Sequence, residues 1–232
     1  MLLPGVANFI CPSGGPRVTA TAEPGVSRGA VAEAFDRLVV PLLLYFAGHE
    51  VLHASAIQGE NGVVGFCAEA GTGKSTLAYG LSTRGFRLFA DDALAVDVSQ
   101  QPRALLLPFG PRLRPKTRKF FETSSSLSSS DPPAERDRLV ALAVIKRIAA
   151  GGVAAQIEQL RGGRAFHEVV RHAYRLGLQH DYARRKTLIE NYMRIVGSVP
   201  VFEISFRPGF QRFPSVLDRV AEFLDAELGQ AA

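Results

Sequence analysis

The sequence lacks the features of several specialised protein classes. Its 232 residues include two cysteines and no tryptophan, and two cysteines cannot form the disulfide framework of a small secreted protein. No apolar run reaches the roughly 18 residues of a membrane-spanning helix, because the longest, 39–47, contains Pro41. The N-terminus has no basic stretch followed by a hydrophobic segment. We therefore expect a cytoplasmic protein without a membrane span.

The charge balance is positive, with 27 Lys and Arg against 22 Asp and Glu, and a net charge of +5. That sign attracts nucleotides, acidic peptides and nucleic acids. The local basic clusters carry no interleaved aromatic residues of a nucleic-acid stacking surface, so we expect no nucleic-acid partner. The composition, 47% hydrophobic and 21% charged, is that of an ordinary globular protein. We predict a single domain over residues 1–232, with a flexible serine-rich loop at 123–133.

The most informative segment lies between an apolar run at 62–67 and a helix start at 77–81. It reads Ala68, Glu69, Ala70, Gly71, Thr72, Gly73, Lys74, Ser75 and Thr76. A strand, a glycine-rich turn and a helix start predict a phosphate-binding loop, where backbone N–H groups face an anion. Gly71 and Gly73 permit positive φ, Lys74 supplies a charge for the outer phosphates, and Ser75 offers its hydroxyl to Mg²⁺. We expect these nine residues to bind ATP or another nucleoside triphosphate.

One position departs from the phosphate-loop pattern G-x-x-x-x-G-K-[ST], because Ala68 stands where the first glycine belongs. If the backbone there needs a positive φ, alanine is strained by about 1 kcal/mol. If its φ is negative, the substitution costs little.

Two acidic residues, Asp91 and Asp92, follow a short apolar run at 88–90. Successive strand residues point to opposite sides, so one carboxylate could reach a metal while the other faces a substrate hydroxyl. A simple turn start or helix cap is the alternative. Next to a phosphate loop we favour the functional reading, with Ser75, Asp91 and Asp92 as candidate metal ligands.

His53 lies in a further apolar strand, predicted at 51–57. Asn61-Gly62 is typical of a tight hairpin turn, which would bring this strand beside the loop strand at 62–67. The hairpin could place His53 near the phosphate site, where it could tune an aspartate. A structural histidine is the alternative.

The rest of the chain predicts alternating helices and strands. We expect a helix over 28–46, capped by Ser27 and ended or kinked early by Pro41. Residues 88–96 are expected as strand, with 88–90 as a short buried strand that ends in the acidic pair. Further strands are predicted at 103–109, 139–145, 154–160 and 199–206, and further helices at 74–84, 165–176, 182–196 and 214–228.

The runs 53–57, 68–78 and 84–92 together resemble the catalytic domain of HPr kinase/phosphorylase. The resemblance is closer to the short HPr-kinase-like proteins of bacterial peptide-modification clusters, including lasso-peptide kinases. It implies an α/β fold of the type shared with phosphoenolpyruvate carboxykinase, with mixed sheets around the loop helix. It also implies an ATP- and Mg²⁺-dependent serine kinase in which His53, Lys74, Asp91 and Asp92 are catalytic. By resemblance Asp91 is the proton acceptor, and we expect His53 to hold that aspartate in position.

The sequence also departs from the HPr enzymes. We expect no separate regulatory domain before His53, the HPr-docking signature is reduced to an echo at 159–163, and Thr76 stands where those enzymes have Glu. We therefore expect the acceptor to be a serine or threonine hydroxyl of another peptide or protein, most of all a ribosomal precursor peptide. Arg112, Arg114 and Lys116 are the candidates to meet an acidic peptide end, or else form a solvated basic loop.

Two other functions stay open, a small-molecule kinase and a nucleotide-binding regulatory module without catalysis. The intact Lys74, Ser75 and aspartate pair disfavour the second of these. A homo-oligomer is possible, and a phosphate loop reads phosphates rather than the base.

Overall fold

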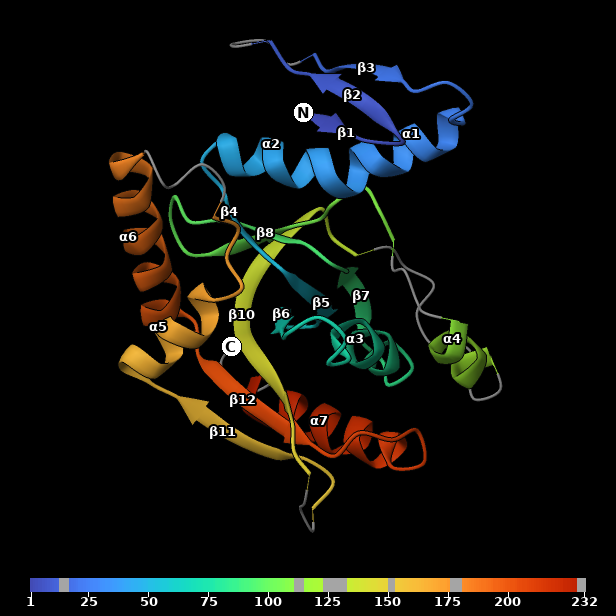
Figure 1. Cartoon of the computed structure of the whole chain (residues 1–232). Coiled ribbons are helices and arrows are strands. Elements are labelled where there is room, and N and C mark those ends of the chain that lie inside the picture. Colours follow the sequence, from blue (N-terminus) through green and yellow to red (C-terminus); the bar gives the residue numbers. More distant parts are fainter. Residues whose placement is uncertain (13–16, 111–114, 123–132, 150–152, 176–180, 229–232) are drawn as a thin grey trace.

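The computed structural model describes residues 1–12, 17–110, 115–122, 133–149, 153–175 and 181–228. A mixed sheet with helices on both faces forms the body, and a small three-stranded sheet lies at the N-terminal end (Figure 1). The predicted α/β class, with mixed strand directions around the loop helix, is confirmed. Residues 123–132 of the expected serine-rich loop lie outside the described ranges.

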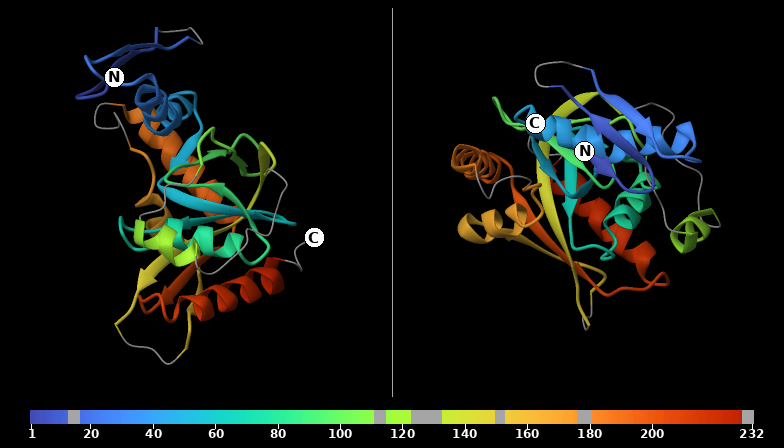
Figure 2. Two further views of the ribbon diagram at one scale, coloured as in Figure 1. Left: turned by 90° about the vertical axis from the view of Figure 1, so that its right-hand side faces the viewer. Right: turned by 45° about the horizontal axis from the view of Figure 1, so that its top comes forward.

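The small sheet and the first helical segment form an N-terminal layer. Figure 2 shows the small sheet beyond the helices, on their side away from the main sheet. Its elements are β1 (Leu2–Leu3), β2 (Ala7–Ile10), β3 (Thr19–Ala22), α1 (Arg28–Ala34), the π-helix η1 (Phe35–Val39) and α2 (Val40–Phe46). Ser27 caps α1 as predicted, since its Oγ accepts a hydrogen bond of 3.2 Å from the N–H of Ala30.

Of the two effects predicted for Pro41, an early end of the helix is not observed. The chain continues in helical conformation to Phe46, with Pro41 in the first turn of α2. A π-helical turn, η1, comes just before it, with the N–H of Val40 bonded to the carbonyl of Phe35. The proline has no N–H to donate, and its ring must avoid the preceding turn. A widened turn at this point accommodates the ring without breaking the helix.

The main sheet has nine strands, and its longest strand, β10, holds its two parts together. The path β4-β8-β9-β10-β6-β5-β7 continues at β10 into β12 and β11. β10 runs parallel to β6 and β12, whereas the other pairs are antiparallel. The strands are β4 (Glu50–Leu52), β5 (Ala54–Gly59), β6 (Gly62–Cys67), β7 (Arg87–Ala90), β8 (Leu94–Asp97), β9 (Arg103–Leu105), β10 (Arg136–Arg147), β11 (Gln156–Leu160) and β12 (Val201–Phe206).

Two predicted strands are each broken in the middle. The strand expected at 51–57 divides at His53 into β4 and β5, and the strand expected at 88–96 divides at 91–93 into β7 and β8. The halves join different parts of the sheet, because β4 pairs with β8 while β5 pairs with β7. The two breaks therefore lie opposite each other, and the pairing between the two strands is interrupted at that point. The predicted hairpin is confirmed, but its turn lies one residue earlier than Asn61-Gly62: the turn residues are Glu60 and Asn61, and Gly59 pairs with Gly62.

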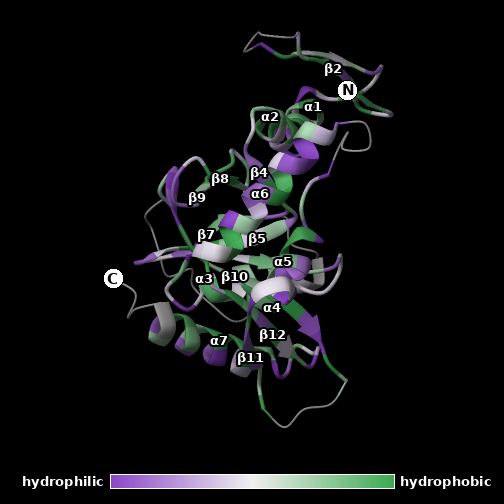
Figure 3. Ribbon diagram, turned by 90° about the vertical axis from the view of Figure 1, so that its left-hand side faces the viewer, coloured by the Kyte–Doolittle hydropathy of each residue, from purple (hydrophilic) through white to green (hydrophobic). Residues whose placement is uncertain are grey.

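Helices cover both faces of the sheet, and strand alternation divides the core in two. The remaining helices are α3 (Lys74–Ser82), α4 (Pro115–Glu122), α5 (Gly162–Val170), α6 (Tyr182–Ser198) and α7 (Phe213–Leu228). Phe66 of β6 packs with Leu77 of α3 and Val220 of α7, whereas its neighbour Cys67 faces Tyr192 of α6. Hydrophobic and hydrophilic stretches alternate along α7 in Figure 3, as expected for a helix with one buried face.

Other predicted elements are present with different bounds. The strand predicted at 103–109 is shorter, and the one at 139–145 extends over the twelve residues of β10. The helix predicted at 165–176 ends at Val170, since Ala173 forms a β-bridge with Leu52. In the described ranges, none of the helices is long and apolar enough to span a membrane.

Candidate active site

The strand, glycine-rich loop and helix form as predicted. β6 leads into the loop, and α3 begins at Lys74 with Gly73 as its N-cap residue. Gly71 and Gly73 have φ of 80° and 116°, which only glycine adopts readily. Among the described non-glycine residues only Asp92 has a positive φ, so Ala68 is not strained. The alanine in place of the pattern's first glycine is therefore tolerated locally.

Lys74 is 7% exposed and points back over the loop. Its ammonium lies 3.0 Å from the carbonyl oxygen of Ala68 and 3.0 Å from Nε2 of His53. Burial lowers the pKa of Lys74, and nearby carboxylates, Asp92 first among them, oppose that shift. At the helix N-terminus the lysine is thus held by a carbonyl oxygen and an imidazole nitrogen, both uncharged, which leaves its charge for an anion.

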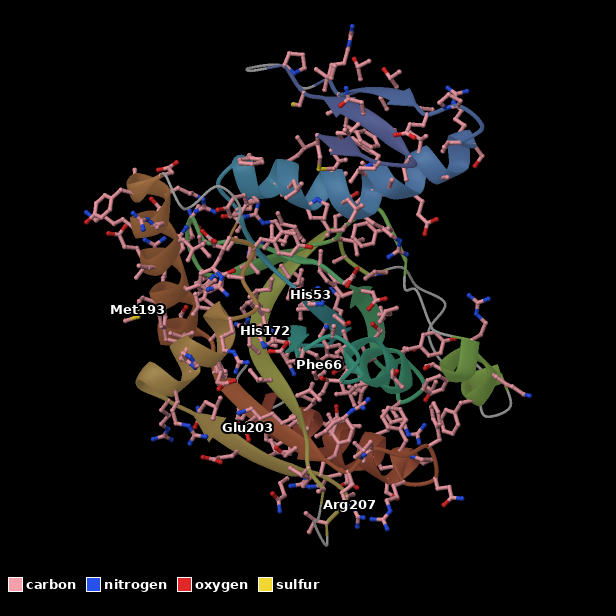
Figure 4. All side chains as sticks on the ribbon, viewed as in Figure 1. His53, Phe66, His172, Met193, Glu203 and Arg207 are labelled. Carbon is pink, nitrogen blue, oxygen red and sulfur yellow. The ribbon has the colours of Figure 1, made fainter. Side chains whose placement is uncertain are left out.

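His53 links the lysine to the acidic pair. Its Nδ1 lies 3.0 Å from the backbone oxygen of Asp92 and 3.4 Å from that residue's Oδ1. An ammonium can only donate, so Nε2 accepts from Lys74 and the neutral ring carries its proton on Nδ1. His53 also donates its backbone N–H to the carbonyl of His172 at 2.7 Å, and Figure 4 shows the two histidines close together. The hairpin thus brings His53 to the phosphate loop, as the sequence suggested.

The two aspartates lie in different surroundings. Asp91 is 3% exposed, and its Oδ1 accepts a hydrogen bond of 2.8 Å from Ser55 Oγ. The side chain of Asp92 is 63% exposed, and its backbone takes the left-handed conformation with φ of 74°. Aspartate tolerates this conformation better than most residues, since its short side chain bonds locally. The strand break at 91–93 separates the environments of the pair.

A cavity of about 910 Å³ brings most of these groups together. Its size suits a nucleotide. The lining residues are Arg37, His53, Ala70, Gly71, Thr72, Gly73, Lys74, Ser75, Thr76, Asp91, Asp92, Thr117, Arg147, Phe206, Pro208, Gly209, Phe210 and Phe213. Of the predicted loop, Ala68 and Glu69 do not line it. Ala68 supplies its carbonyl to Lys74, and Glu69 forms an ion pair of 2.8 Å with Arg171.

Sequence reasoning missed the cations and aromatic residues that complete this cavity. Arg147 donates from Nε to the carbonyl of Thr72 at 3.0 Å and from Nη2 to that of Gly71 at 2.7 Å. A signal for it existed, because Arg147 ends a strand parallel to β6, and ligands of such sheets bind at the carboxyl ends of the strands. Arg37, from η1, is remote in sequence and carried no such signal.

The oxygen ligands at the site suit magnesium. Ser75, Asp91 and Asp92 all line the cavity beside the loop, and Mg²⁺ is commonly held by one or two carboxylates together with substrate phosphates and water. Within the described ranges there is no group of three or more His, Cys, Asp or Glu residues that would hold a metal alone. The residues therefore fit a metal that arrives with a nucleotide.

The structure does not test the predicted substrate cations. Arg112 and Arg114 lie outside the described residues, and only the backbone of Lys116 is described, in the first turn of α4. Their role stays a prediction.

Comparison with known proteins adds a distant structural similarity. No family model matches the sequence, and neither does any curated protein. Among solved structures the chain is similar to the HPr(Ser) kinase/phosphatase from Coxiella burnetii, with 13% sequence identity and a TM-score of 0.36. The match covers 75% of this chain and 96% of the other. A similarity at this level assigns neither family nor substrate.

Proposed function

We propose that this protein is an ATP-dependent kinase that phosphorylates a serine or threonine hydroxyl of a peptide or protein. One observation carries the proposal: Lys74 lies at the N-terminus of α3, 3.0 Å from His53, in a cavity that Asp91 and Asp92 also line. A phosphate-binding lysine and two carboxylates in one cavity are what phosphoryl transfer to a hydroxyl requires. The resemblance of residues 51–96 to HPr kinase supports the same chemistry.

Each group has a role in the proposed reaction. The loop N–H groups and Lys74 hold the outer phosphates and stabilise charge on the transferred group. Asp91, fixed by Ser55, accepts the proton of the attacking hydroxyl, because a base must keep one direction. The acceptor oxygen forms a bond to the γ-phosphorus. The bond between the γ-phosphorus and the bridging oxygen breaks, and the nucleoside diphosphate leaves.

Asp92 is the proposed metal ligand with Ser75, since its exposed carboxylate can bind a cation that keeps several waters. Mg²⁺, when bound with the nucleotide, neutralises phosphate charge. His53 contacts Asp92, whereas the sequence led us to expect that it would hold the proton acceptor. We therefore propose that His53 positions the metal-binding aspartate and Lys74.

The proposed acceptor is a ribosomal precursor peptide. The short HPr-kinase-like relatives of peptide-modification clusters support this choice, as does the net charge of +5, which favours an acidic partner. The echo of the HPr-docking signature, at 159–163, lies in β11 and the start of α5 and does not line the phosphate cavity. HPr is therefore the less favoured acceptor.

The test is phosphate transfer from ATP to the precursor peptide encoded beside the gene, followed by mass spectrometry. Wild-type enzyme should add one phosphate to a serine, and Lys74→Ala should lower the rate by about a hundredfold or more. Lys186→Ala, on the exposed side of α6, is the matched control and should keep full activity. A Lys74→Ala rate within about threefold of wild type would remove the loop from the mechanism. If the enzyme phosphorylated HPr efficiently and phosphorylated none of the peptides, HPr would be the acceptor.

A further inference from the structure

Part of the cavity lining is aromatic. Phe206 ends β12, Phe210 lies in the connection that follows, and Phe213 begins α7. Phe120 of α4 packs against two of them, with ring centroids 4.9 Å from Phe210 and 6.3 Å from Phe213. Phe206 and Phe213 are 6.4 Å apart. Elements distant in the sequence thus converge on one apolar wall.

Phe210 differs from the other rings because it is exposed as well as lining the cavity. Phe206 and Phe213 are 4% and 6% exposed, as expected for core residues, whereas Phe210 is 41% exposed. Gly209, with φ of 139°, makes the backbone turn that precedes it. Phe120 supports the ring at a tilt of 30°. The ring is therefore held in place by a neighbour and yet still lines the cavity.

The cavity as a whole has the polarity of a nucleotide. The phosphate loop, Lys74 and Arg147 line it together with Pro208 and the three phenylalanines. A nucleoside triphosphate likewise joins a strongly anionic end to a flat aromatic base. A base stacks on an aromatic side chain whatever its identity, because every base has a π-face.

We infer that Phe210 is the platform on which the base of the bound nucleotide stacks. This inference rests on the proposed function, since it assumes that the triphosphate occupies the loop. The side chains that accompany Phe210 in this wall, those of Phe206, Pro208 and Phe213, carry no hydrogen-bonding group. Thr117 has a hydroxyl, which lies 3.5 Å from that of Thr76. The site should therefore favour purines over pyrimidines by stacking area and discriminate little between adenine and guanine.

The test compares two anions that share phosphates and differ in the base. Calorimetry with Mg²⁺ should give Phe210→Ala an ATP Kd about tenfold or more above wild type, and an unchanged Kd for inorganic triphosphate. Phe210→Tyr should restore ATP binding. Phe46→Ala is the matched control, because Phe46 is 71% exposed on α2 and does not line the cavity. The wild-type protein should bind ATP and GTP more tightly than CTP and UTP. This difference in affinity should be smaller in the Phe210→Ala variant.

Each contrary outcome has a separate meaning. An unchanged ATP Kd in Phe210→Ala would place the base elsewhere and overturn this inference, leaving the kinase proposal intact. Equal weakening of ATP and triphosphate would mean a distorted loop and would also overturn it. If wild type and Lys74→Ala bind triphosphate equally, the phosphate site itself fails, and the proposed function with it.

Discussion

At the scale of single residues, Asp91 and Asp92 are neighbours in the sequence but lie in different environments. The bond from Ser55 and nearly complete burial fix Asp91, whereas Asp92 is open to the cavity beside His53. A carboxylate with one fixed direction suits proton transfer, and an exposed one suits a hydrated metal. The difference arises from the break in the strand, which turns the backbone between them.

This difference predicts that the two asparagine variants fail differently. Asp91→Asn should bind Mg²⁺ and ATP with near wild-type affinity and lose turnover by about a hundredfold or more, the usual scale for a positioned base. Asp92→Asn should weaken Mg²⁺-dependent ATP binding. Calorimetry and initial rates measure the two effects separately. Normal binding and turnover in both variants would reduce the pair to a turn, and an exchange of the two phenotypes would exchange the roles.

Lys74 gives nucleotide binding a defined pH dependence. Burial lowers its pKa below the ordinary 10.5. If Lys74 holds the outer phosphates in its charged form, as proposed, ATP affinity is complete while Lys74 is protonated and falls as the pH rises through its pKa. Since that pKa is lowered, the fall should begin at a lower pH than for an exposed lysine. ATP Kd, measured from about pH 7 upward, should show it.

Lys74→Arg is the control for this titration, because a guanidinium stays charged over the whole range. Its Kd should be higher than that of wild type, since Arg does not fit the lysine position, but independent of pH. A wild-type Kd that stays flat to pH 10.5 would contradict the assignment of the lysine to the phosphates.

At the scale of elements, α3 must hold the loop at one end while its body packs closely on α7. Gly80 permits this approach, because a Cβ built there would lie 2.5 Å from Leu217 Cδ2 and 2.8 Å from its Cδ1. Leu217 is 2% exposed and has little room to move. The close contact between these helices therefore depends on a residue without a side chain.

Gly80→Ala should consequently destabilise the protein, by about 1–3 kcal/mol, although alanine favours helix more than glycine does. Gly197→Ala in α6 is the matched control, since a Cβ there meets nothing within 4 Å. It should be neutral or stabilise by up to about 1 kcal/mol. Urea unfolding of both variants checks this. A stabilised Gly80→Ala would mean that α7 moves away at no cost.

At the scale of the whole molecule, a buried ion pair joins α6 to the start of β4. Glu50 is completely buried, and its Oε1 accepts hydrogen bonds of 2.8 Å from Arg184 and 2.8 Å from Asn191. The Arg184 guanidinium also lies 4.4 Å from the centroid of the Tyr45 ring on α2. One cluster thus connects the N-terminal helices, the sheet and α6, and β4 leads from it directly to His53.

Removing the cation should leave the Glu50 carboxylate buried without an opposite charge, with the neutral Asn191 amide as its remaining hydrogen-bond donor of the two. Arg184→Met should lower the free energy of unfolding by about 3–5 kcal/mol. Lys186→Met removes one partner of the exposed pair with Glu190, on the same helix, and should cost at most about 0.5 kcal/mol. Denaturant melts of the two variants make the comparison. Equal, small losses would show that water reaches Glu50 in the folded protein.

Much of the phosphate loop was predictable because its determinants are local. A strand, two glycines that take positive φ and a lysine at a helix start lie within a dozen residues, and their chemistry requires no distant partner. The hairpin signal at Asn61-Gly62 also made the position of His53 predictable, since a hairpin turn sets which strands are neighbours. The sequence by itself therefore determined the loop, its lysine and the histidine beside it.

Tertiary structure alone decided the remainder. Arg147 and Phe210 reach the cavity only through the pairing of β10 with β6 and of β12 with β10. The breaks at His53 and Asp91 depend on paired strands that separate together, which no periodicity within either strand reveals. Local patterns specify conformation within a few residues, whereas the cavity is made by contacts across the sheet. For that reason the glycine-rich loop, its lysine and His53 could be predicted from the sequence, whereas the aromatic residues of the cavity could not.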